Sequence, residues 1–484
     1  MSEQDNNELQ RGLSERHINM IAIGGAIGTG LFVALGGSLA SGGPGGVLLA
    51  YGGIGIMVFF LMTSLGEMAT HLPVAGSFET YATRFIDPAL GFASGVNYWF
   101  GWAMTLACEF EAAAIIMKFW FPDVSSAIWT ALFFILLYAL NVFSVKGYGE
   151  SEFWFAGIKV VAIIVFLILG ILIMFNVIGG GGVTFENWTV GDAPFPGGFK
   201  GTLAIFMIAG FSFQGTEMIG VTAGETKNPE KAIPKAVKTV FFRILIFYIG
   251  AVCVIATLIP YNDPSLLQAD IDNLAVSPFT LVFQRAGIKA AAHIMNFVIL
   301  TSVLSAGNTG LYGATRVLYA MGQQGKAPKW FAKVTKRGVP LNALNFTAFF
   351  GLFSFLGSFV GDGFIYLWLV NMTGMCGFVT WITIAACHWR FRRAFVAQGH
   401  DVSELKYHAA LYPFGPVMTF IVCAIVICGQ FWAYNAYNFV DFMGCYLGLF
   451  VFLFVWIYFK IRHHTKVVPL MEVDVTPLDP ETHH

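Results

Sequence analysis

Glycine and polar residues interrupt two hydrophobic stretches of the chain at their centres. The first stretch runs from Met20 to Leu39 and is interrupted by GGAIGTG at 24–30. The second runs from Thr202 to Ala223 and is interrupted by SFQGTE at 212–217. Backbone polar groups that are freed at membrane depth are tolerated only where they are buried in protein or line a cavity. Matching interruptions in two halves of a chain therefore predict a ligand-binding site.

A helix that is unwound at its centre presents two kinds of free backbone group. N–H groups at Gly28, Thr29 and Gly30 suit an anion such as a carboxylate, and glycine lets the backbone approach that ligand closely. Carbonyl groups near Ala26, and from Phe211 to Gln214, suit a cation such as an ammonium. The two interruptions together predict a ligand that carries both charges close together, as the head group of an α-amino acid does.

These glycines have two other interpretations. Gly25-x-x-Gly28-x-Gly30 superficially resembles a phosphate-binding loop, but it follows no strand and opens no βαβ unit. Small residues also mark close packing between membrane helices, which would explain the first interruption taken alone. The second interruption makes packing alone the weaker explanation.

The composition predicts an all-α integral membrane protein. Of 484 residues, 57% are hydrophobic and only 11% are charged, against about 25% charged residues in soluble domains. Apolar segments of the length that crosses a bilayer recur along the chain. We expect twelve spans, at 18–42, 46–71, 88–120, 126–145, 152–177, 199–224, 236–260, 278–321, 342–359, 363–386, 414–434 and 440–461.

Interrupted spans 1 and 6 divide the chain into two halves of opposite orientation. We expect a cytoplasmic tail at 1–17, a first inverted repeat at 18–177, a second at 199–386, two further spans at 414–461 and a cytoplasmic tail at 462–484. With both termini in the cytoplasm, the inner loops collect most of the lysines and arginines, for example those at 227–238 and 326–337. This distribution follows the positive-inside rule.

Several classes of function lack the residues they would need. The seven cysteines fall inside apolar segments with no metal-ligand spacing, so neither a metal site nor a cofactor is expected. No basic tract suggests nucleic acid as a partner, and the polar N-terminus is unlike a cleavable signal peptide. A membrane enzyme would need a nucleophile with a base or a nucleotide loop, and the sequence shows neither.

Ordered motifs over essentially the whole chain resemble those of the amino-acid permeases of the amino acid–polyamine–organocation superfamily. They are IGGAIGTGLF at 23–32, PVAGSF at 73–78, GFSFQGTE at 210–217 and GETKNPEKAIPKA at 224–236. Within that family the chain is most similar to the bacterial lysine-specific branch, on YNDPSLL at 261–267, VSPFTLVFQ at 276–284 and LSAGN at 304–308. The resemblance implies that residues 28–30 hold a substrate carboxylate and that carbonyls of Ala26, Phe211 and Gln214 hold its α-ammonium. It also implies that the Phe211 ring closes over the substrate.

Ionisable residues inside a membrane are expensive, so each is a functional candidate. Glu109 and Glu111 lie midway along span 3, two residues apart, and therefore face different sides of a helix. Glu109 matches an acidic position of the family, whereas Glu111 departs from the lysine branch, which is apolar there. Either acid is a candidate to pair with a substrate ammonium, the alternative being a polar bond between helices.

The resemblance gives the other membrane charges a role in coupling. Glu217 matches an acid tied to coupling or gating, although a structural cap is the alternative. Lys159 matches a lysine that proton-coupled relatives place against span 1. A buried lysine loses its proton more readily than one in water, so deprotonation would loosen span 1. We therefore expect coupling to protons and not to sodium.

Four further residues are expected at the side-chain end of the pocket. Tyr98 and Trp102 lie four apart on one helical face and match aromatic positions of the lysine branch, although packing is the alternative. Asn308 and Thr373 lie on spans 8 and 10. A regulatory membrane partner is doubtful, because Asn273 breaks the acidic pattern that the lysine branch uses for such a contact.

The resemblance implies import of a cationic L-amino acid, lysine or ornithine, across a bacterial inner membrane by proton symport with alternating access. The partners would be the amino acid, protons and the lipid bilayer. A permease for neutral amino acids and an amino-acid antiporter are alternatives within transport. A membrane sensor that binds an amino acid without flux is the alternative from another class.

Overall fold

The computed structural model describes residues 20, 27–74, 77–143, 145–178, 185–223, 228–267, 277–335, 337–409 and 411–477. Within these ranges the regular structure is helical and contains no β-strand, which confirms the predicted all-α class. Ten of the described helices are long and apolar enough to cross a membrane, and the shorter apolar helix at Ser126–Val142 lies where span 4 was predicted. The chain is a multi-pass membrane protein.

The membrane helices follow the predicted order. They are α3 (Ala34–His71), α5 (Pro88–Met117), α6 (Ser126–Phe143), α7 (Val145–Met174), α8 (Gly198–Phe213) with α9 (Met218–Thr222), α10 (Pro229–Arg243) continued through a π-helical turn (Ile244–Ile249) into α11 (Gly250–Leu258), α14 (Lys289–Gln323), α15 (Leu341–Gly351) continued through a 3-10 turn (Leu352–Leu356) into α16 (Gly357–Val360), α17 (Asp362–Ala397), α18 (Phe414–Ala433) and α19 (Phe439–His463). Short helices are α2 (Thr29–Phe32), α4 (Phe78–Phe85), α12 (Pro264–Leu267) and α13 (Pro278–Arg285).

Some predicted boundaries differ from the observed ones. The end of span 1 and all of span 2 form one helix, α3, which is kinked where Gly43 has φ 68°. Gly43 precedes Pro44, and a Cβ at Gly43 would lie 2.3 Å from Pro196, so only glycine fits this bend. The span predicted at 278–321 is two helices, α13 and α14, because the chain turns at Gly287 with φ 76°.

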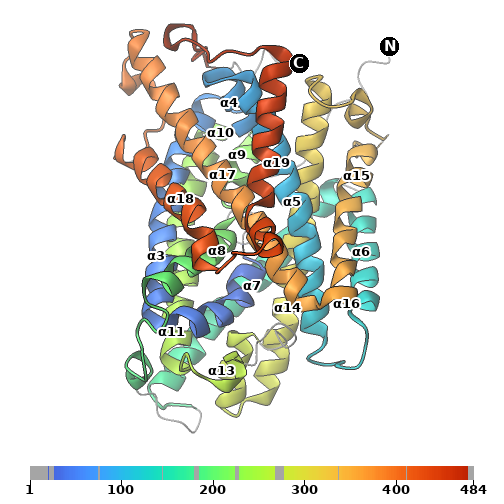
Figure 1. Cartoon of the computed structure of the whole chain (residues 1–484), viewed down its shortest axis with the longest axis vertical. Coiled ribbons are helices and arrows are strands. Elements are labelled where there is room, and N and C mark those ends of the chain that lie inside the picture. The colour runs from blue at the N-terminus through green and yellow to red at the C-terminus, as the bar shows by residue number, and fades with distance from the viewer. Residues whose placement is uncertain are drawn as a thin grey trace.

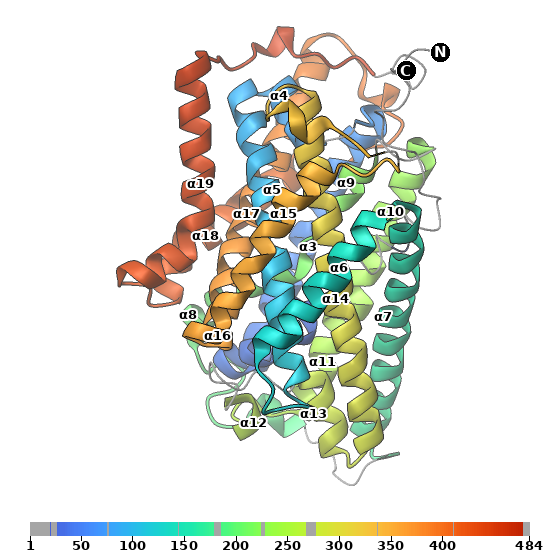
Figure 2. The same ribbon diagram turned by 90° about the vertical axis from the view of Figure 1, so that its right-hand side faces the viewer.

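The helices form a bundle with short helices at both ends. Helix α4 lies at one end, and α12 and α13 lie at the other (Figures 1 and 2). Helix α5 runs through the middle of the bundle, packed against both α14 and α17. Helix α3 packs along α8, while α19 and α7 occupy opposite edges in Figure 2. Segments from both halves of the chain therefore meet around α5.

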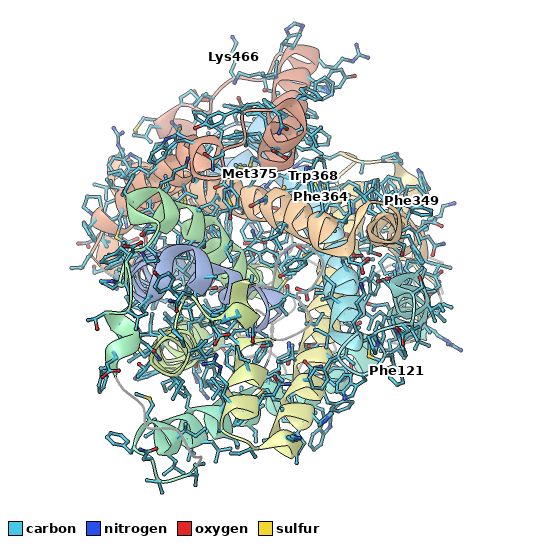
Figure 3. All side chains as sticks on the ribbon, turned by 60° about the horizontal axis from the view of Figure 1, so that its bottom comes forward. Phe121, Phe349, Phe364, Trp368, Met375 and Lys466 are labelled. Carbon is cyan, nitrogen blue, oxygen red and sulfur yellow. The ribbon has the colours of Figure 1, made fainter. Side chains whose placement is uncertain are left out.

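The outer surface of the bundle is rich in large apolar side chains. Phe121 and Phe349 lie on the outside of the helices in Figure 3 and are 48% and 57% exposed. Phe454 on α19 is also exposed. Such side chains suit contact with lipid hydrocarbon and not with water.

The segment after α19 folds back across the end of the bundle that carries α4. The Val468 N–H donates to the carbonyl of Ile86 at 2.8 Å, next to α4. Arg84 of α4 forms an ion pair with Asp474 at 2.6 Å. His71, at the end of α3, bonds the carbonyl of Val475 at 2.8 Å. This segment therefore connects α3 and α4 at one end of the molecule.

Candidate substrate site

The first predicted interruption lies only partly within the described residues. Ile27 and Gly28 are not helical, and α2 begins at Thr29. A Cβ at Gly30 would lie 2.5 Å from the Cα of Ser212, so the backbones of the two interruptions touch at this glycine. Ala26, predicted to offer a carbonyl here, lies outside the described residues.

The second interruption is present where the sequence predicted it. Helix α8 ends at Phe213, residues 214–217 form a turn, and α9 begins at Met218. Several carbonyls at the end of α8 already accept hydrogen bonds. The Gln214 N–H donates to the Phe211 carbonyl at 3.2 Å, and the Tyr248 hydroxyl donates to the Ser212 carbonyl at 2.8 Å. A carbonyl oxygen has two lone pairs, so Phe211 retains one for a ligand.

Tyr51 of α3 connects the two interruptions. Its hydroxyl donates to the Gly30 carbonyl at 3.2 Å and lies 3.0 Å from the Ser212 Oγ. The ring of Tyr51 lies beside that of Tyr248, which stacks on Phe213 with the ring centroids 4.2 Å apart. These buried rings hold the start of α2 against the end of α8, next to the two unwound segments. Tyr51 is not predictable from the sequence, because one tyrosine in an apolar stretch carries no distinguishing pattern.

Glu109 of α5 lies against the first interruption. The Thr29 Oγ1 donates to Glu109 Oε1 at 3.1 Å, and a Cβ at Gly28 would lie 3.1 Å from the same oxygen. Glu109 is 3% exposed, and its Oε2 accepts no hydrogen bond from the described residues. The carboxyl group is therefore placed to meet a positive charge bound at the interruption.

Glu111 points elsewhere. Its carboxyl group lies against Gly357, where a Cβ would be 2.0 Å from Glu111 Oε1. Nearby Asp362, at the start of α17, forms an ion pair with Lys118 and accepts from Ser126. Glu111 thus belongs to a polar cluster between α5, α16 and α17. The structure does not bring it to the interruptions, as expected for a residue two positions from Glu109 on a helix.

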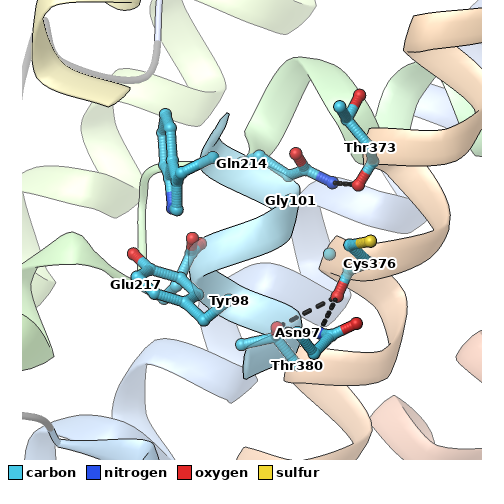
Figure 4. Close-up of a pocket in the computed structure, with 10 residues that line it drawn as sticks. Asn97, Tyr98, Gly101, Gln214, Glu217, Thr373, Cys376 and Thr380 are labelled. Carbon is cyan, nitrogen blue, oxygen red and sulfur yellow. Dashed lines mark hydrogen bonds between the residues drawn. The ribbon is translucent and has the colours of Figure 1, made fainter. Parts of the chain in front are cut away.

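A cavity lies between α5, the second interruption and α17. Five of its lining residues are among those predicted from the sequence, and the others are on the same helices (Figure 4). The lining residues are Asn97, Tyr98, Gly101, Trp102, Gln214, Glu217, Thr373, Cys376, Gly377 and Thr380. Its volume is about 10 Å³, which is room for about one water molecule. A side chain enters only if the helices around the cavity separate.

Hydrogen bonds and a contact between two aromatic rings hold the residues that line this cavity in place. Gln214 Nε2 donates to the Thr373 carbonyl at 2.8 Å, which ties the second interruption to α17. Glu217 accepts from the Trp381 indole at 3.3 Å and from the Gly215 N–H at 3.1 Å. The Tyr98 ring lies edge-on to Trp102, with the centroids 6.1 Å apart. Glu217, which lines the cavity, therefore stabilises the turn at 214–217 through its hydrogen bond with Gly215 and connects the turn to Trp381 of α17.

Asn308 is not among the residues that line this cavity. Its Oδ1 accepts from Asn141 Nδ2 at 2.7 Å, which joins α14 to α6. The preceding residue, Gly307, lies against Glu109, because a Cβ at Gly307 would be 3.3 Å from the Glu109 Cβ. Asn308 thus lies one position away from the contact between α14 and Glu109.

Lys159 of α7 is fully buried. Its Nζ lies 4.0 Å from Oε1 of Glu152, which is also fully buried. Lys159 of α7 also interacts electrostatically with Glu109 of α5. Glu152 was not among the predicted site residues, although it lies seven positions before Lys159 and hence on the same helical face.

A second buried charge cluster was also missed. Glu67 of α3 accepts from Arg392 Nε at 2.7 Å and from the Ala409 N–H at 2.6 Å, and it lies 3.0 Å from His388 Nε2. The Arg392 guanidinium lies over the Tyr412 ring, 4.8 Å from its centroid. This cluster joins α3 to α17 near the end of the bundle that carries α4. Glu67 falls within the span predicted at 46–71, whereas His388 and Arg392 follow the span predicted at 363–386, so only the fold shows that they meet.

The site's chemistry is binding, with polar backbone at two unwound segments and one carboxyl group beside them. Among the described residues, no group of three or more metal-binding side chains is present.

The amino acid permease family model matches residues 17–469. The chain is 50% identical to the lysine-specific permease LysP of Escherichia coli over 469 residues, or 96% of each chain.

Two further relatives come from Lactococcus lactis. Identity to its lysine-specific permease LysP is 47% over 476 residues, covering 97% of this chain and 93% of the relative. Identity to its histidine permease HisP is 44% over 482 residues, covering 98% and 99%. The resemblance that the sequence motifs carried is thereby confirmed over nearly the whole length.

Proposed function

Because this chain belongs to the amino-acid permease family, which consists of transporters and not enzymes, we propose that it imports a cationic L-amino acid, lysine or ornithine, by proton symport. Two relatives that carry the name lysine-specific permease support the choice of a cationic substrate. The observation that carries the proposal is the placement of the Glu109 carboxyl group at the first interruption, 3.1 Å from Thr29 Oγ1.

The substrate's head group binds between the two interruptions. Backbone N–H groups of residues 28–30 hold its carboxylate, and carbonyls of Ala26, Phe211 and Gln214 hold its α-ammonium. The Phe211 ring closes over it, and the side chain extends toward Tyr98, Trp102 and Thr373. Glu109 supplies the negative charge for the substrate, and Glu111 stays outside the site.

Transport requires a conformational change in which the helices that line the small cavity move apart. The chain has twelve spans, with a five-plus-five inverted repeat and two further helices, and both termini face the cytoplasm of a bacterium. Helices α8 and α9 move relative to α5 and α17, which exposes the site to one side of the membrane at a time. A negative interior favours entry of a cation by about 2.3 kcal/mol per charge per 100 mV. Proton coupling through Lys159, with Glu217 bracing the turn, adds to that driving force.

Uptake into proteoliposomes tests this proposal. Labelled lysine, ornithine, arginine and a neutral amino acid are compared, each with and without a pH gradient, acidic outside. We expect accumulation of lysine or ornithine that rises with the gradient and is abolished by a protonophore. A preference for neutral amino acids, or uptake only in exchange for internal amino acid, would favour the alternative permease or antiporter. Binding without any flux would favour a sensor.

A further inference from the structure

Lys159 and Glu152 form a buried ion pair on α7, with Lys159 Nζ 4.0 Å from Glu152 Oε1. Both side chains are fully buried, and seven residues separate them. Seven residues correspond to about 10.5 Å along a helix. Lys159 is the deeper of the two, because Glu152 lies two turns closer to the start of α7 at Val145. The positive-inside rule places that start at the cytoplasmic face.

The carboxyl group of Glu152 is held in place by α14. Ser305 Oγ donates to Glu152 Oε1 at 2.6 Å. Glu152 Oε2 accepts no hydrogen bond from the described residues, although a buried carboxylate ordinarily has partners for both oxygens. Oε1 is therefore the oxygen that faces both Lys159 and Ser305, and it is the one placed to receive a proton from Lys159.

The groups that act on this pair come from α5, α7 and α14. Lys159 and the hydroxyls of Ser305 and Thr309 act on Glu152. Glu152 and Glu109 both act electrostatically on Lys159. Lys159 therefore interacts with an acid at the substrate site and with an acid nearer the cytoplasmic start of α7. That order matches the direction in which an imported proton must travel.

We propose that Glu152 receives the coupled proton from Lys159 and releases it toward the cytoplasm. This inference rests on the proposed function. In the step, an N–H bond of the Lys159 ammonium breaks and an O–H bond forms on Glu152, which leaves a neutral amine and a neutral acid. A carboxylate and an ammonium that exchange one proton conserve total charge, so the step needs no counterion in the low-dielectric interior. In the next cycle a proton that enters from outside binds the Glu109 carboxylate and then passes to the neutral Lys159 amine, which leaves Glu109 charged again for the substrate.

Two transport assays separate this role from a structural one. Gradient-driven accumulation needs net proton movement, whereas counterflow exchanges labelled for unlabelled substrate without it. We expect Glu152→Gln to lower gradient-driven lysine accumulation at least tenfold while counterflow stays within about twofold of wild type. Glu152→Asp keeps a titratable group and is expected to restore accumulation in part. Its accumulation should show a shifted dependence on internal pH.

Glu150→Gln is the matched control, because it removes an acid from the same helix two positions away. It is expected to retain both activities. Accumulation by Glu152→Gln at the wild-type level would overturn the inference and leave the proposed function standing. Equal loss of accumulation and counterflow would also overturn it, since that result assigns Glu152 a structural role. A wild-type protein that shows no gradient-driven accumulation of any amino acid would overturn the proposed function, and the inference with it.

Discussion

Thr29 Oγ1 donates a hydrogen bond to Glu109 Oε1 at 3.1 Å, which joins the first interruption to the last third of α5. This contact brings an acid to the place where two interrupted stretches meet. Because Gly30 touches Ser212 there, the acid and both unwound segments share one small region. Each part of that region therefore has a role that a substitution can test.

Replacing Glu109 by glutamine tests its role as the partner of a substrate cation. The glutamine side chain keeps the shape and can accept from Thr29, but it removes the charge. A hydrogen-bonded charge contributes about 1.5–3 kcal/mol, so we expect lysine affinity to fall about 10- to 100-fold. Affinity is measured by scintillation proximity with purified protein. Glu111→Gln is the control, because Glu111 lies away from the interruptions, and an equal loss in that variant would contradict the assignment.

Substituting Gly30 by alanine tests the contact between the two unwound segments. The added Cβ would lie 2.5 Å from a backbone atom of Ser212, so one segment must move. We expect uptake to fall more than tenfold at matched expression. Gly37→Ala provides the comparison, because nothing lies within 4 Å of a Cβ at Gly37. Full uptake by Gly30→Ala would mean that the segments do not pack as described.

The buried cluster around Glu67 should contribute strongly to stability. Glu67→Ala would leave the guanidinium of Arg392 and the N–H of Ala409 without an acceptor that they now share. Removing one partner of a buried ion pair costs about 3–5 kcal/mol. We expect a lower melting temperature and a lower yield of monodisperse protein in detergent, measured by fluorescence-detected size exclusion. Glu230→Ala, which breaks the exposed contact with Lys406, should change neither.

The lowered pKa of Asp87, at the start of α5, leads us to expect that the protein loses stability in acid. Burial opposes its charge, but the Lys460 ammonium, the Thr465 hydroxyl and the Ala89 N–H outweigh burial and hold the pKa of Asp87 below its ordinary value of 3.8. The charge therefore stabilises the fold above the ordinary pKa, and that contribution is lost as pH falls through the lowered value.

Asp87→Asn preserves the helix cap and removes the charge, so it isolates this effect. Partly exposed ion pairs contribute about 0–1 kcal/mol, so we expect the melting temperature to fall by about 1–3 °C at pH 7. The difference from wild type should shrink below pH 4. A difference that stays constant across this pH range would show that the charge of Asp87 is not what stabilises the contact.

Sequence reasoning identified the features that depend on local chemistry. The interruption predicted at 212–217 appears as a turn at 214–217 between α8 and α9, where the Gly215 N–H donates to the Glu217 carboxyl group. It also placed Tyr98, Trp102, Gln214, Glu217 and Thr373, which line one cavity.

Features that depend on packing between distant segments were not predictable. Whether Glu109 or Glu111 faces the interruptions depends on how α5 is rotated in the bundle, and two residues of one helix cannot reveal that alone. The ion pair between Glu67 and Arg392 connects residues that are 325 positions apart in the sequence, and no local sequence pattern links them. The position of Asn308 on span 8 predicts it in the pocket, but it does not line the described cavity, and its Oδ1 accepts from Asn141.

The most direct test of the central claim is a structure determined with lysine bound. We predict density for the amino acid between the two unwound segments, with its carboxylate at hydrogen-bond distance from the N–H groups of residues 28–30. The α-ammonium should contact the carbonyls of Phe211 and Gln214, and the Glu109 carboxyl group should lie nearby. Lysine bound elsewhere in the bundle, with these backbone groups left without contact to it, would contradict the account.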